Sequence, residues 1–319
     1  MIYDLIIIGA GPAGISAGIY AARKKMSILM IEKYFEVGGQ LIKNAWIDNY
    51  PGFPGISGFE LLQNLKNHID KNVVIVQEEE VTKFKKVNNV FKVISLKNNY
   101  EARSIIIATG MESKRSGAIN EEKFIGRGIS FCATCDVPLY KDKVVGVYGN
   151  GPEAEKTILE LLPFAKTIYF ISDKKNENYQ LEEVKKNIES GNVIIRTDTT
   201  INSFKGNDIL EKVNIKSGKI IEDLEIEGFF INLGYVPVTD FVKDFLKINS
   251  KKEIITDQIN RTSVEGVFAA GDCTSYPYRQ VITAAAQGAA AALSSYKYLH
   301  GLLLPVTGFN ENAELSKSS

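Results

Sequence analysis

Two cysteines separated by two residues are the part of this sequence best suited to chemistry. They lie in the segment Cys132-Ala-Thr-Cys135. This spacing fits a short redox disulfide, and it equally fits one half of a zinc site. Asp136 follows directly and could shuttle the proton that thiolate chemistry requires. The simpler interpretation of Asp136 is a turn-forming residue ahead of Pro138.

The elements that must position this chemistry begin with a glycine-rich unit at the N-terminus. An apolar run over residues 5–8 leads into a glycine motif, and a helical segment then leads to a second apolar run. The motif is G-x-G-x-x-G, formed by Gly9, Gly11 and Gly14. It permits a tight turn, close approach of a pyrophosphate and close helix–strand packing. Because Glu32 ends the second run, where it is placed to accept from ribose hydroxyls, the unit predicts dinucleotide binding.

The same unit recurs 140 residues later in the chain. Gly149 and Gly151 correspond to the first two glycines, Ala154 to the third and Ser172 to the acidic residue. Two dinucleotide-type folds predict two domains, which agrees with a length of 319 residues at about 150 residues per domain. The duplication leaves open whether both copies bind a nucleotide.

The position of the cysteine pair, shortly before this second unit, favours redox chemistry over zinc. A zinc ion needs two further ligands, and the chain offers only Cys273, His68 and His300, with no second pair at metal-ligand spacing. Structural zinc and two inert core cysteines with chance spacing are the alternatives. Cys273 is expected to be a small buried residue.

Composition excludes several classes of protein. Lys plus Arg and Asp plus Glu number 38 each, so the net charge is zero and generic binding to nucleic acid or anionic membranes is not expected. No uninterrupted apolar run approaches the ~20 residues of a membrane span. Asp4 stands where a signal peptide would be basic, and three cysteines are too few for a secreted disulfide scaffold. We expect a cytoplasmic protein.

Further strands and one long helix follow from local patterns. Apolar runs at 73–76 and 90–96, with a turn at Asn88-Asn89, predict a small antiparallel sheet, and the Lys-rich residues 83–86 predict a solvated strand edge. Buried strands are expected at 104–110 and before Asp272. The helix predicted at 284–300 is rich enough in Ala and Gly to pack closely against another backbone.

Several motifs in a fixed order make the sequence resemble the low-molecular-weight thioredoxin reductases, flavoproteins that reduce a partner disulfide through their own Cys-x-x-Cys pair. The resemblance covers nearly the whole chain, and the ordered set is more specific than any single motif. The motifs are Gly9–Gly14, Gly38–Leu41, Asp48–Gly52, Ala108–Gly110, Phe131–Asp136, Ala269–Asp272 and Arg279–Val281.

The resemblance implies an α/β fold with two Rossmann-like domains, each of three layers (two β and one α). The FAD-binding domain would be discontinuous, with residues 1–113 and 241–319. A central domain of pyridine-nucleotide type, residues 114–240, would be inserted into it and carry the cysteine pair. The resemblance also implies a homodimer and thioredoxin as the partner.

The resemblance assigns roles in FAD binding. It implies that the glycine motif holds the pyrophosphate, Glu32 the adenosine ribose and Asp272 the ribityl or phosphate side. It further places Gln40 and Asn49 along the flavin and Arg279 with Gln280 at the isoalloxazine. The other residues expected to contact the cofactor are Pro12, Ala13, Gly39, Leu41, Val81, Ala108, Thr109, Gly110, Gly271 and Val281. Within the redox motif, Cys135 would face the flavin, Cys132 would attack thioredoxin and Asp136 would serve as the acid–base residue.

Two departures from the family concern the electron donor. Members that use NADPH have His-Arg-Arg at the end of the second copy's strand, where this chain has Ser172-Asp-Lys174. Asp173 would repel the 2′-phosphate that two guanidinium groups would otherwise bind. The family's Gly-His-x-Pro-Asn reads Gly234-Tyr-Val-Pro-Val238 here. These departures favour a branch that takes electrons from ferredoxin, with the second fold kept as a scaffold.

Two other functions are considered beside ferredoxin-dependent thioredoxin reduction. One keeps the same disulfide chemistry but uses NADPH or NADH. The other is a flavin-binding redox sensor or scaffold whose thiols do not turn over. The polar tail after Pro305 carries Phe309, which is a candidate to cover the flavin or the nicotinamide position, with a frayed terminus as the alternative.

Overall fold

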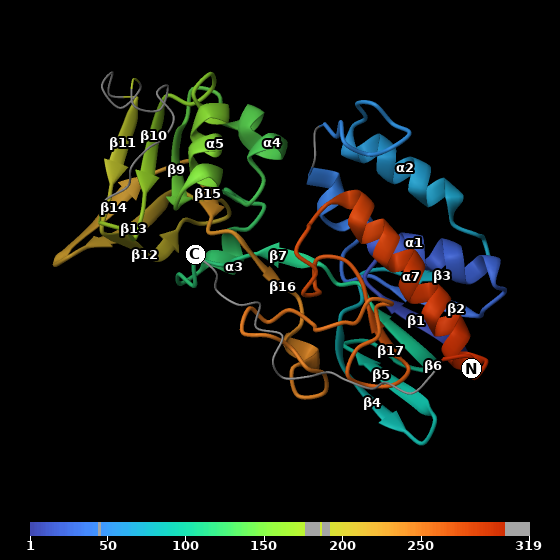
Figure 1. Cartoon of the computed structure of the whole chain (residues 1–319). Coiled ribbons are helices and arrows are strands. Elements are labelled where there is room, and N and C mark those ends of the chain that lie inside the picture. The colour runs from blue at the N-terminus through green and yellow to red at the C-terminus, as the bar shows by residue number, and fades with distance from the viewer. Residues whose placement is uncertain (44–45, 176–185, 187–191, 304–319) are drawn as a thin grey trace, which may run out of the picture. The chain divides into compact units, whose positions relative to one another are not determined.

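The structure is a computed structural model that describes residues 1–43, 46–175, 186 and 192–303. The tail with Phe309 lies outside these residues. The chain divides into two compact units, of which unit 1 comprises Met1–Glu112 with Pro237–Ser319 and unit 2 comprises Ser113–Val236. Where the chain passes between the units, β7 (Met111–Ser113) pairs with β16 (Tyr235–Pro237) (Figure 1).

Unit 1 is built on a sheet with the order β3-β2-β1-β6-β5-β4, and β17 pairs with β6. Its strands are β1 (Ile2–Ile8), β2 (Ile28–Ile31), β3 (Val74–Val76), β4 (Val81–Val87), β5 (Val90–Ser95), β6 (Asn99–Ile107) and β17 (Val267–Ala269). Its helices are α1 (Pro12–Arg23), α2 (Gly58–His68), α7 (Val281–Leu299) and the 3-10 turns η1 (Gly39–Lys43) and η3 (Asp240–Val242). The expected parallel βαβ unit is confirmed, because β1 pairs in parallel with β2 and with β6.

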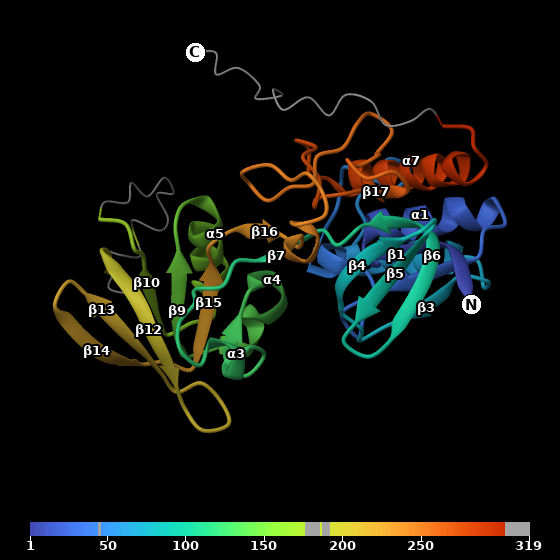
Figure 2. The same ribbon diagram turned by 90° about the horizontal axis from the view of Figure 1, so that it is seen from below.

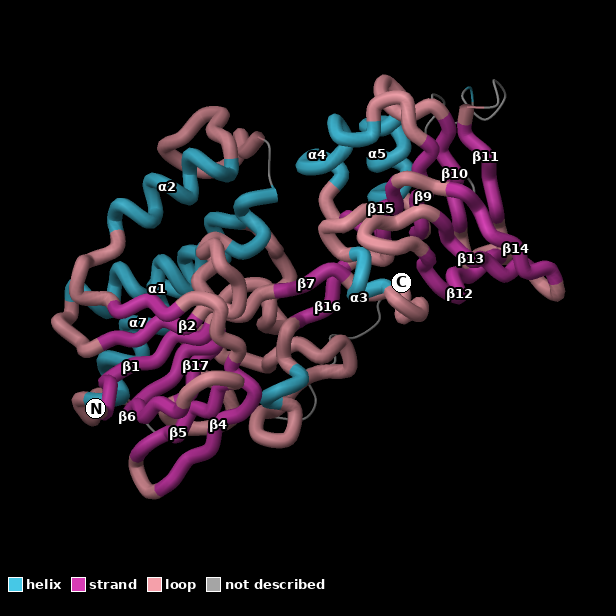
Figure 3. Tube along the Cα trace, turned by 180° about the vertical axis from the view of Figure 1, so that it is seen from behind, coloured by secondary structure: helices cyan, strands magenta, loops and turns pink. Residues whose placement is uncertain are grey.

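Two apolar clusters cover the two faces of this sheet. On one face, Ile7, Met30 and Phe268 pack with residues of α1 and α7. On the other, Ile6 and Ile8 pack with residues of β4 and β5. Strand alternation sends neighbouring residues of β1 to opposite faces, so its uninterrupted apolar run serves both cores. Figures 2 and 3 show the hairpin of β4 and β5 on one side of the unit and α1 with α7 on the other.

The segment at residues 73–76 differs from the sequence prediction. Instead of joining an antiparallel sheet, β3 pairs in parallel with β2, with Leu29 opposite Val74. A run of four apolar residues is too short for its pattern to distinguish a parallel edge strand from one arm of a hairpin. The antiparallel hairpin and its turn at Asn88-Asn89 are confirmed by the β4–β5 register, which pairs Val87 with Val90. The exposed Lys83 and Lys85 lie on β4, at the end of the sheet order.

Unit 2 repeats the architecture on a smaller scale. Its parallel sheet has the order β11-β10-β9-β15-β8, and a second, antiparallel sheet has the order β12-β13-β14. The parallel strands are β8 (Ile129–Ser130), β9 (Val144–Gly149), β10 (Thr167–Ile171), β11 (Val193–Arg196) and β15 (Gly228–Asn232). The antiparallel strands are β12 (Thr199–Lys205), β13 (Lys212–Ser217) and β14 (Ile220–Glu225), and the helices are α3 (Glu121–Phe124), α4 (Ala133–Asp136), η2 (Val137–Tyr140) and α5 (Pro152–Leu161).

The core of unit 2 has the predicted layers. Ile158 and Leu161 of α5 pack on one face of the parallel sheet. Phe204 and Val213 of the antiparallel sheet pack with Phe229 on the other. The result is a three-layer α/β fold with parallel sheets, as predicted. Among the described residues, no helix has both the length and the apolar character that crossing a bilayer requires.

Close contact between α1 and α7 confirms the packing predicted for the Ala- and Gly-rich helix. A Cβ atom placed on Gly288 would lie 2.0 Å from the carbonyl oxygen of Ala13. A backbone carbonyl cannot move aside as a flexible side chain can. Ala13 directly follows the first residue of α1, so the same contact fixes the N-terminus of that helix.

We predict that Gly288→Ala destabilises the protein, although Ala is favoured over Gly in a helix by about 1 kcal/mol. The clash with Ala13 should cost about 1–3 kcal/mol beyond that gain, which lowers the midpoint of urea unfolding followed by circular dichroism. The matched control is Ala286→Gly on the exposed side of the same helix, which reports the propensity alone. A higher midpoint for Gly288→Ala would contradict the packing argument.

Candidate functional site

The glycine motif forms a turn in which backbone meets backbone. Gly9 has φ +101°, and a Cβ there would lie 2.4 Å from the carbonyl oxygen of Ala108 on the neighbouring chain segment. A Cβ on Gly14 would lie 1.9 Å from the carbonyl oxygen of Gly9. A Cβ on Gly11, by contrast, would enter open space. Packing therefore explains Gly9 and Gly14, whereas Gly11 keeps the backbone accessible to a ligand at the N-terminus of α1.

Glu32 lies beside this turn as predicted. Its side chain is buried, with one oxygen accepting from the backbone N–H of Ala10 at 2.7 Å and the other from Tyr34 at 3.1 Å. Each carboxylate oxygen has a further lone pair, so these bonds fix the carboxylate and still leave acceptor capacity for a ribose hydroxyl. A buried carboxylate thus lies next to the N-terminus of α1. The carboxylate fits the ribose of a dinucleotide, and the helix N-terminus fits its pyrophosphate.

Three other predicted motifs meet the same turn. A Cβ on Gly39 would lie 3.4 Å from Gly11, and one on Gly271 would lie 3.0 Å from the Cβ of Ala13. Gly271 also donates its N–H to the side chain of Gln287, at 2.9 Å. Gln287 was not predicted, because no local motif marks it. The motifs at 9–14, 38–41, 108–110 and 269–272 are therefore one site at the carboxyl ends of β1, β6 and β17.

The residues predicted along the flavin make separate polar contacts in unit 1. Asn49 donates to the side chain of Gln280 at 3.0 Å, and Gln40 donates to the carbonyl oxygen of Met111 at 2.9 Å. Arg279 forms an ion pair with the buried carboxylate of Glu253. Glu253 was not predicted, because it lies in a loop with no recognisable pattern.

The remaining predicted residues lie in or near these elements. Pro12 starts α1 and Val281 starts α7, whereas Leu41 and Val81 lie in apolar clusters. Thr109 donates its hydroxyl to the carbonyl oxygen of Val238 at 2.7 Å.

Asp272 is a carboxyl group held in a poorly solvated position. Burial raises the pKa of Asp272, and the nearby Arg279 guanidinium opposes that rise. A partly buried carboxylate next to the glycine turn costs folding free energy unless a ligand donates to it. This arrangement fits a ligand with hydroxyl donors, such as the ribityl chain of FAD.

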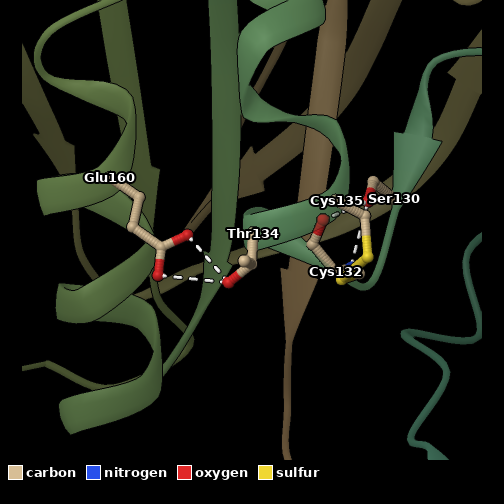
Figure 4. The surroundings of a disulfide bond; sticks show 5 residues. All are labelled: Ser130, Cys132, Thr134, Cys135 and Glu160. Atoms are coloured by element: carbon tan, nitrogen blue, oxygen red, sulfur yellow. Dashed lines mark hydrogen bonds between the residues drawn. A yellow bond between two sulfur atoms is a disulfide. The ribbon is translucent and has the colours of Figure 1, made fainter. Parts of the chain in front are cut away.

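The redox motif lies in unit 2, where Cys132 and Cys135 form a disulfide with a Cα–Cα distance of 5.4 Å. The disulfide supports the redox interpretation of the spacing over the zinc alternative. Cys132 precedes the single turn α4, and its backbone N–H donates to the hydroxyl of Ser130 at 3.0 Å (Figure 4). Asp136 ends that turn and is half-buried. Cys135 is exposed and Cys132 half-buried, so exposure alone does not assign which sulfur attacks a partner.

The two sites together define a class of protein, the flavin-dependent disulfide oxidoreductases. Residues 3–288 match the family model described as pyridine nucleotide-disulphide oxidoreductase. A thioredoxin reductase of Treponema pallidum (strain Nichols) is 37% identical over 303 residues, which cover 94% of this chain and 98% of that protein. The chain therefore belongs to the thioredoxin reductase family of the pyridine nucleotide-disulphide oxidoreductases. Members of this family use FAD.

Two solved structures extend the comparison. Thioredoxin reductase of Lactococcus lactis is 31% identical, with a TM-score of 0.73 and coverage of 94% of this chain and 100% of that chain. A ferredoxin-flavin thioredoxin reductase from Clostridium acetobutylicum is 32% identical, with a TM-score of 0.53 and coverage of 94% and 98%.

We predict opposite effects of Asp272→Asn on stability and on FAD binding. Because the folded-state pKa of Asp272 is raised, its carboxylate destabilises the apoprotein once the pH exceeds that pKa. The variant apoprotein should therefore unfold at higher urea than the wild type at pH 7, with the difference vanishing at acid pH. FAD affinity should fall about tenfold or more through loss of a charged acceptor, measured by flavin fluorescence quenching. Unchanged affinity would contradict the assignment of Asp272 to the cofactor.

Proposed function

We propose that this thioredoxin reductase takes electrons from reduced ferredoxin and not from a pyridine nucleotide. The observation that carries the proposal is a hydrogen-bond network in unit 2. Asn150, between the two glycines of the second motif, donates to Asp173 at 2.8 Å and accepts from the hydroxyl of Ser172 at 2.6 Å. These side chains follow β10, at the position that Glu32 occupies in the first unit, and they bond to one another there.

The N-terminus of α5 adds a second argument. Its first turn carries Glu153 and Glu155, whereas the first turn of α1 carries no acidic residue. Acidic side chains there interact favourably with the helix dipole and repel a pyrophosphate that would otherwise occupy the same position. Together with Asp173, the acidic residues of unit 2 oppose a dinucleotide at the place where unit 1 favours one.

The loss of the two arginines should weaken the binding of NADPH by orders of magnitude. A charge-assisted hydrogen bond from arginine to the 2′-phosphate contributes about 1.5–3 kcal/mol. Replacing two arginines by Asp173 and Lys174 forfeits about 3–6 kcal/mol, which is about 10²- to 10⁴-fold in affinity. NADH escapes this penalty but finds Ser172 where an acid would bind its ribose. The likeness to the Clostridium acetobutylicum enzyme supports the same donor.

The glycine turn, Glu32 and Asp272 would hold FAD. When bound, FAD would convert single electrons from ferredoxin into the electron pair that a disulfide takes up. In the reduced pair, the Cys132 thiolate attacks the thioredoxin disulfide and forms a mixed disulfide, releasing one thioredoxin thiolate. Cys135 then attacks the Cys132 sulfur, which releases the second thiolate and re-forms the disulfide. Asp136, which directly follows Cys135, would supply a proton to the sulfurs. Thioredoxin gains two electrons and two protons in total.

The proposal also includes the homodimer and the cytoplasmic location that the family resemblance implies. Size-exclusion chromatography with light scattering tests the homodimer directly. A monomer at micromolar concentration would contradict the homodimer. It would not bear on the identity of the electron donor.

We predict that the two cysteines have different roles. With a thioredoxin variant that lacks its second active-site cysteine and carries the remaining one as a mixed disulfide with thionitrobenzoate, Cys135→Ser should accumulate a stable mixed disulfide through Cys132 and release thionitrobenzoate. The product is seen as a mass increase on a non-reducing gel. Cys132→Ser should not. Both should lose turnover. A mixed disulfide formed only by Cys132→Ser would reverse the two roles, and full turnover by either variant would exclude the disulfide mechanism and favour the sensor alternative.

We predict negligible reduction of the flavin by millimolar NADPH or NADH and rapid reduction by reduced ferredoxin, followed by anaerobic stopped-flow absorbance. The triple variant Ser172→His, Asp173→Arg, Lys174→Arg should gain NADPH binding by about 10²-fold or more, because it restores the phosphate-binding groups. Asp208→Arg, on an exposed turn of unit 2, is a control for the added positive charge. Fast bleaching of the wild-type flavin by NADPH would replace the ferredoxin proposal with the nucleotide-dependent one.

A further inference from the structure

The middle of the redox motif is tied to a neighbouring helix by a carboxylate. Thr134, between the two cysteines, donates its hydroxyl to the two carboxylate oxygens of Glu160 on α5, at 3.2 and 3.4 Å. Figure 4 shows the Thr134 side chain directed toward Glu160, with the sulfur atoms of the disulfide at the other end of the turn. Neither residue of this pair has a role in the disulfide exchange described above.

The turn that carries the cysteines depends on such contacts. The helix α4 has only four residues, which is far below the length at which a helix is stable by itself. At its N-terminal end Ser130 holds Cys132, accepting from its N–H and donating to its carbonyl oxygen. At its C-terminal end the chain continues into the buried Val137. Thr134 is exposed, so burial does not hold this part of the turn in place. The hydrogen bond from Thr134 to Glu160 anchors it instead.

The charge of Glu160 also bears on the reaction. Reduction of the disulfide gives thiols that ionise to thiolates, and a nearby negative charge disfavours the thiolate form. When the thiolates are disfavoured, the equilibrium between dithiol and disulfide shifts toward the disulfide. The dithiol then gives up its electrons more readily, so it is a stronger reductant. A strong reductant is what a pair that passes electrons to a partner disulfide requires.

We propose that Glu160 is a positioning residue for the redox pair: through Thr134 it holds the Cys132–Cys135 turn on α5, and its charge makes the dithiol a stronger reductant. This inference rests on the proposed function only in taking the pair as the redox centre. Its test needs neither thioredoxin nor an electron donor protein. The outcome therefore does not depend on whether ferredoxin is the electron donor.

The charge is tested by Glu160→Gln, which keeps an acceptor for Thr134 and removes the negative charge. The full-length, FAD-loaded protein is equilibrated anaerobically with reduced and oxidised dithiothreitol at pH 9, where an ordinary cysteine is largely in the thiolate form on which the charge acts. Dithiothreitol passes two electrons and two protons to the pair and becomes its cyclic disulfide. The reduced fraction is then trapped by alkylation and read by mass at the peptide with Cys132 and Cys135. We expect the equilibrium constant for reduction to rise about two- to fivefold, which is the size expected for one screened charge near the surface.

The matched control for the charge is Glu153→Gln, two turns earlier on the same helix. It removes an equal charge from an exposed residue and should shift the equilibrium less than Glu160→Gln. The proposal fails if Glu160→Gln has the wild-type equilibrium constant, or if both variants shift it equally.

The positioning is tested by Thr134→Val, which keeps the shape of the side chain and removes the donor. Native-state hydrogen exchange of the amides of Asp136 and Val137, which bond back to Cys132 and Ala133, should be about fivefold faster or more in the oxidised protein. Thr134→Ser restores the hydroxyl and should return the wild-type rates, and Glu160→Gln should keep them. Wild-type exchange in Thr134→Val would overturn the positioning role.

Discussion

The approach of backbone to backbone around the start of α1 is the constraint on which the cofactor site depends. Gly14 lets the first turn of α1 reach the carbonyl oxygen of Gly9, and Gly288 lets α7 reach that of Ala13. Gly271 brings the strand-end loop of β17 against the same alanine. Because three chain segments meet there without side chains between them, the accessible backbone at Gly11, the carboxylate of Glu32 and that of Asp272 belong to one small region.

The same supersecondary unit is used twice with opposite electrostatics. In unit 1 the Glu32 carboxylate accepts from the N–H of Ala10, beside a helix start without acidic residues. In unit 2 the corresponding corner is occupied by bonds among Asn150, Ser172 and Asp173. The second unit also carries the redox turn α4, which Thr134 joins to Glu160 of α5. The two copies of the fold thus differ in the polar side chains at their strand ends.

Local patterns in the sequence predicted most of the architecture, because both βαβ units rest on features of neighbouring residues: apolar strands, closely spaced glycines and, in the first unit, a terminal acid. The three-residue strand β3 was assigned to the wrong sheet, since so short a run has no periodicity of its own. Contacts between residues distant in sequence were not predictable either. Glu253 meets Arg279, and Glu160 meets Thr134, only because tertiary packing brings a loop or a helix face to them. The cysteine spacing indicated the disulfide but not what holds it.

The lysines on β4 have a consequence for how copies of the protein avoid one another. A strand at the end of a sheet, such as β4, offers backbone N–H and C=O groups to any other strand. The net charge of the protein is zero. Long-range repulsion between copies is therefore weak. Exposed Lys83 and Lys85 place like charges on this strand. Between two copies brought together along this edge, the repulsion would therefore come from the strand itself and not from the overall charge.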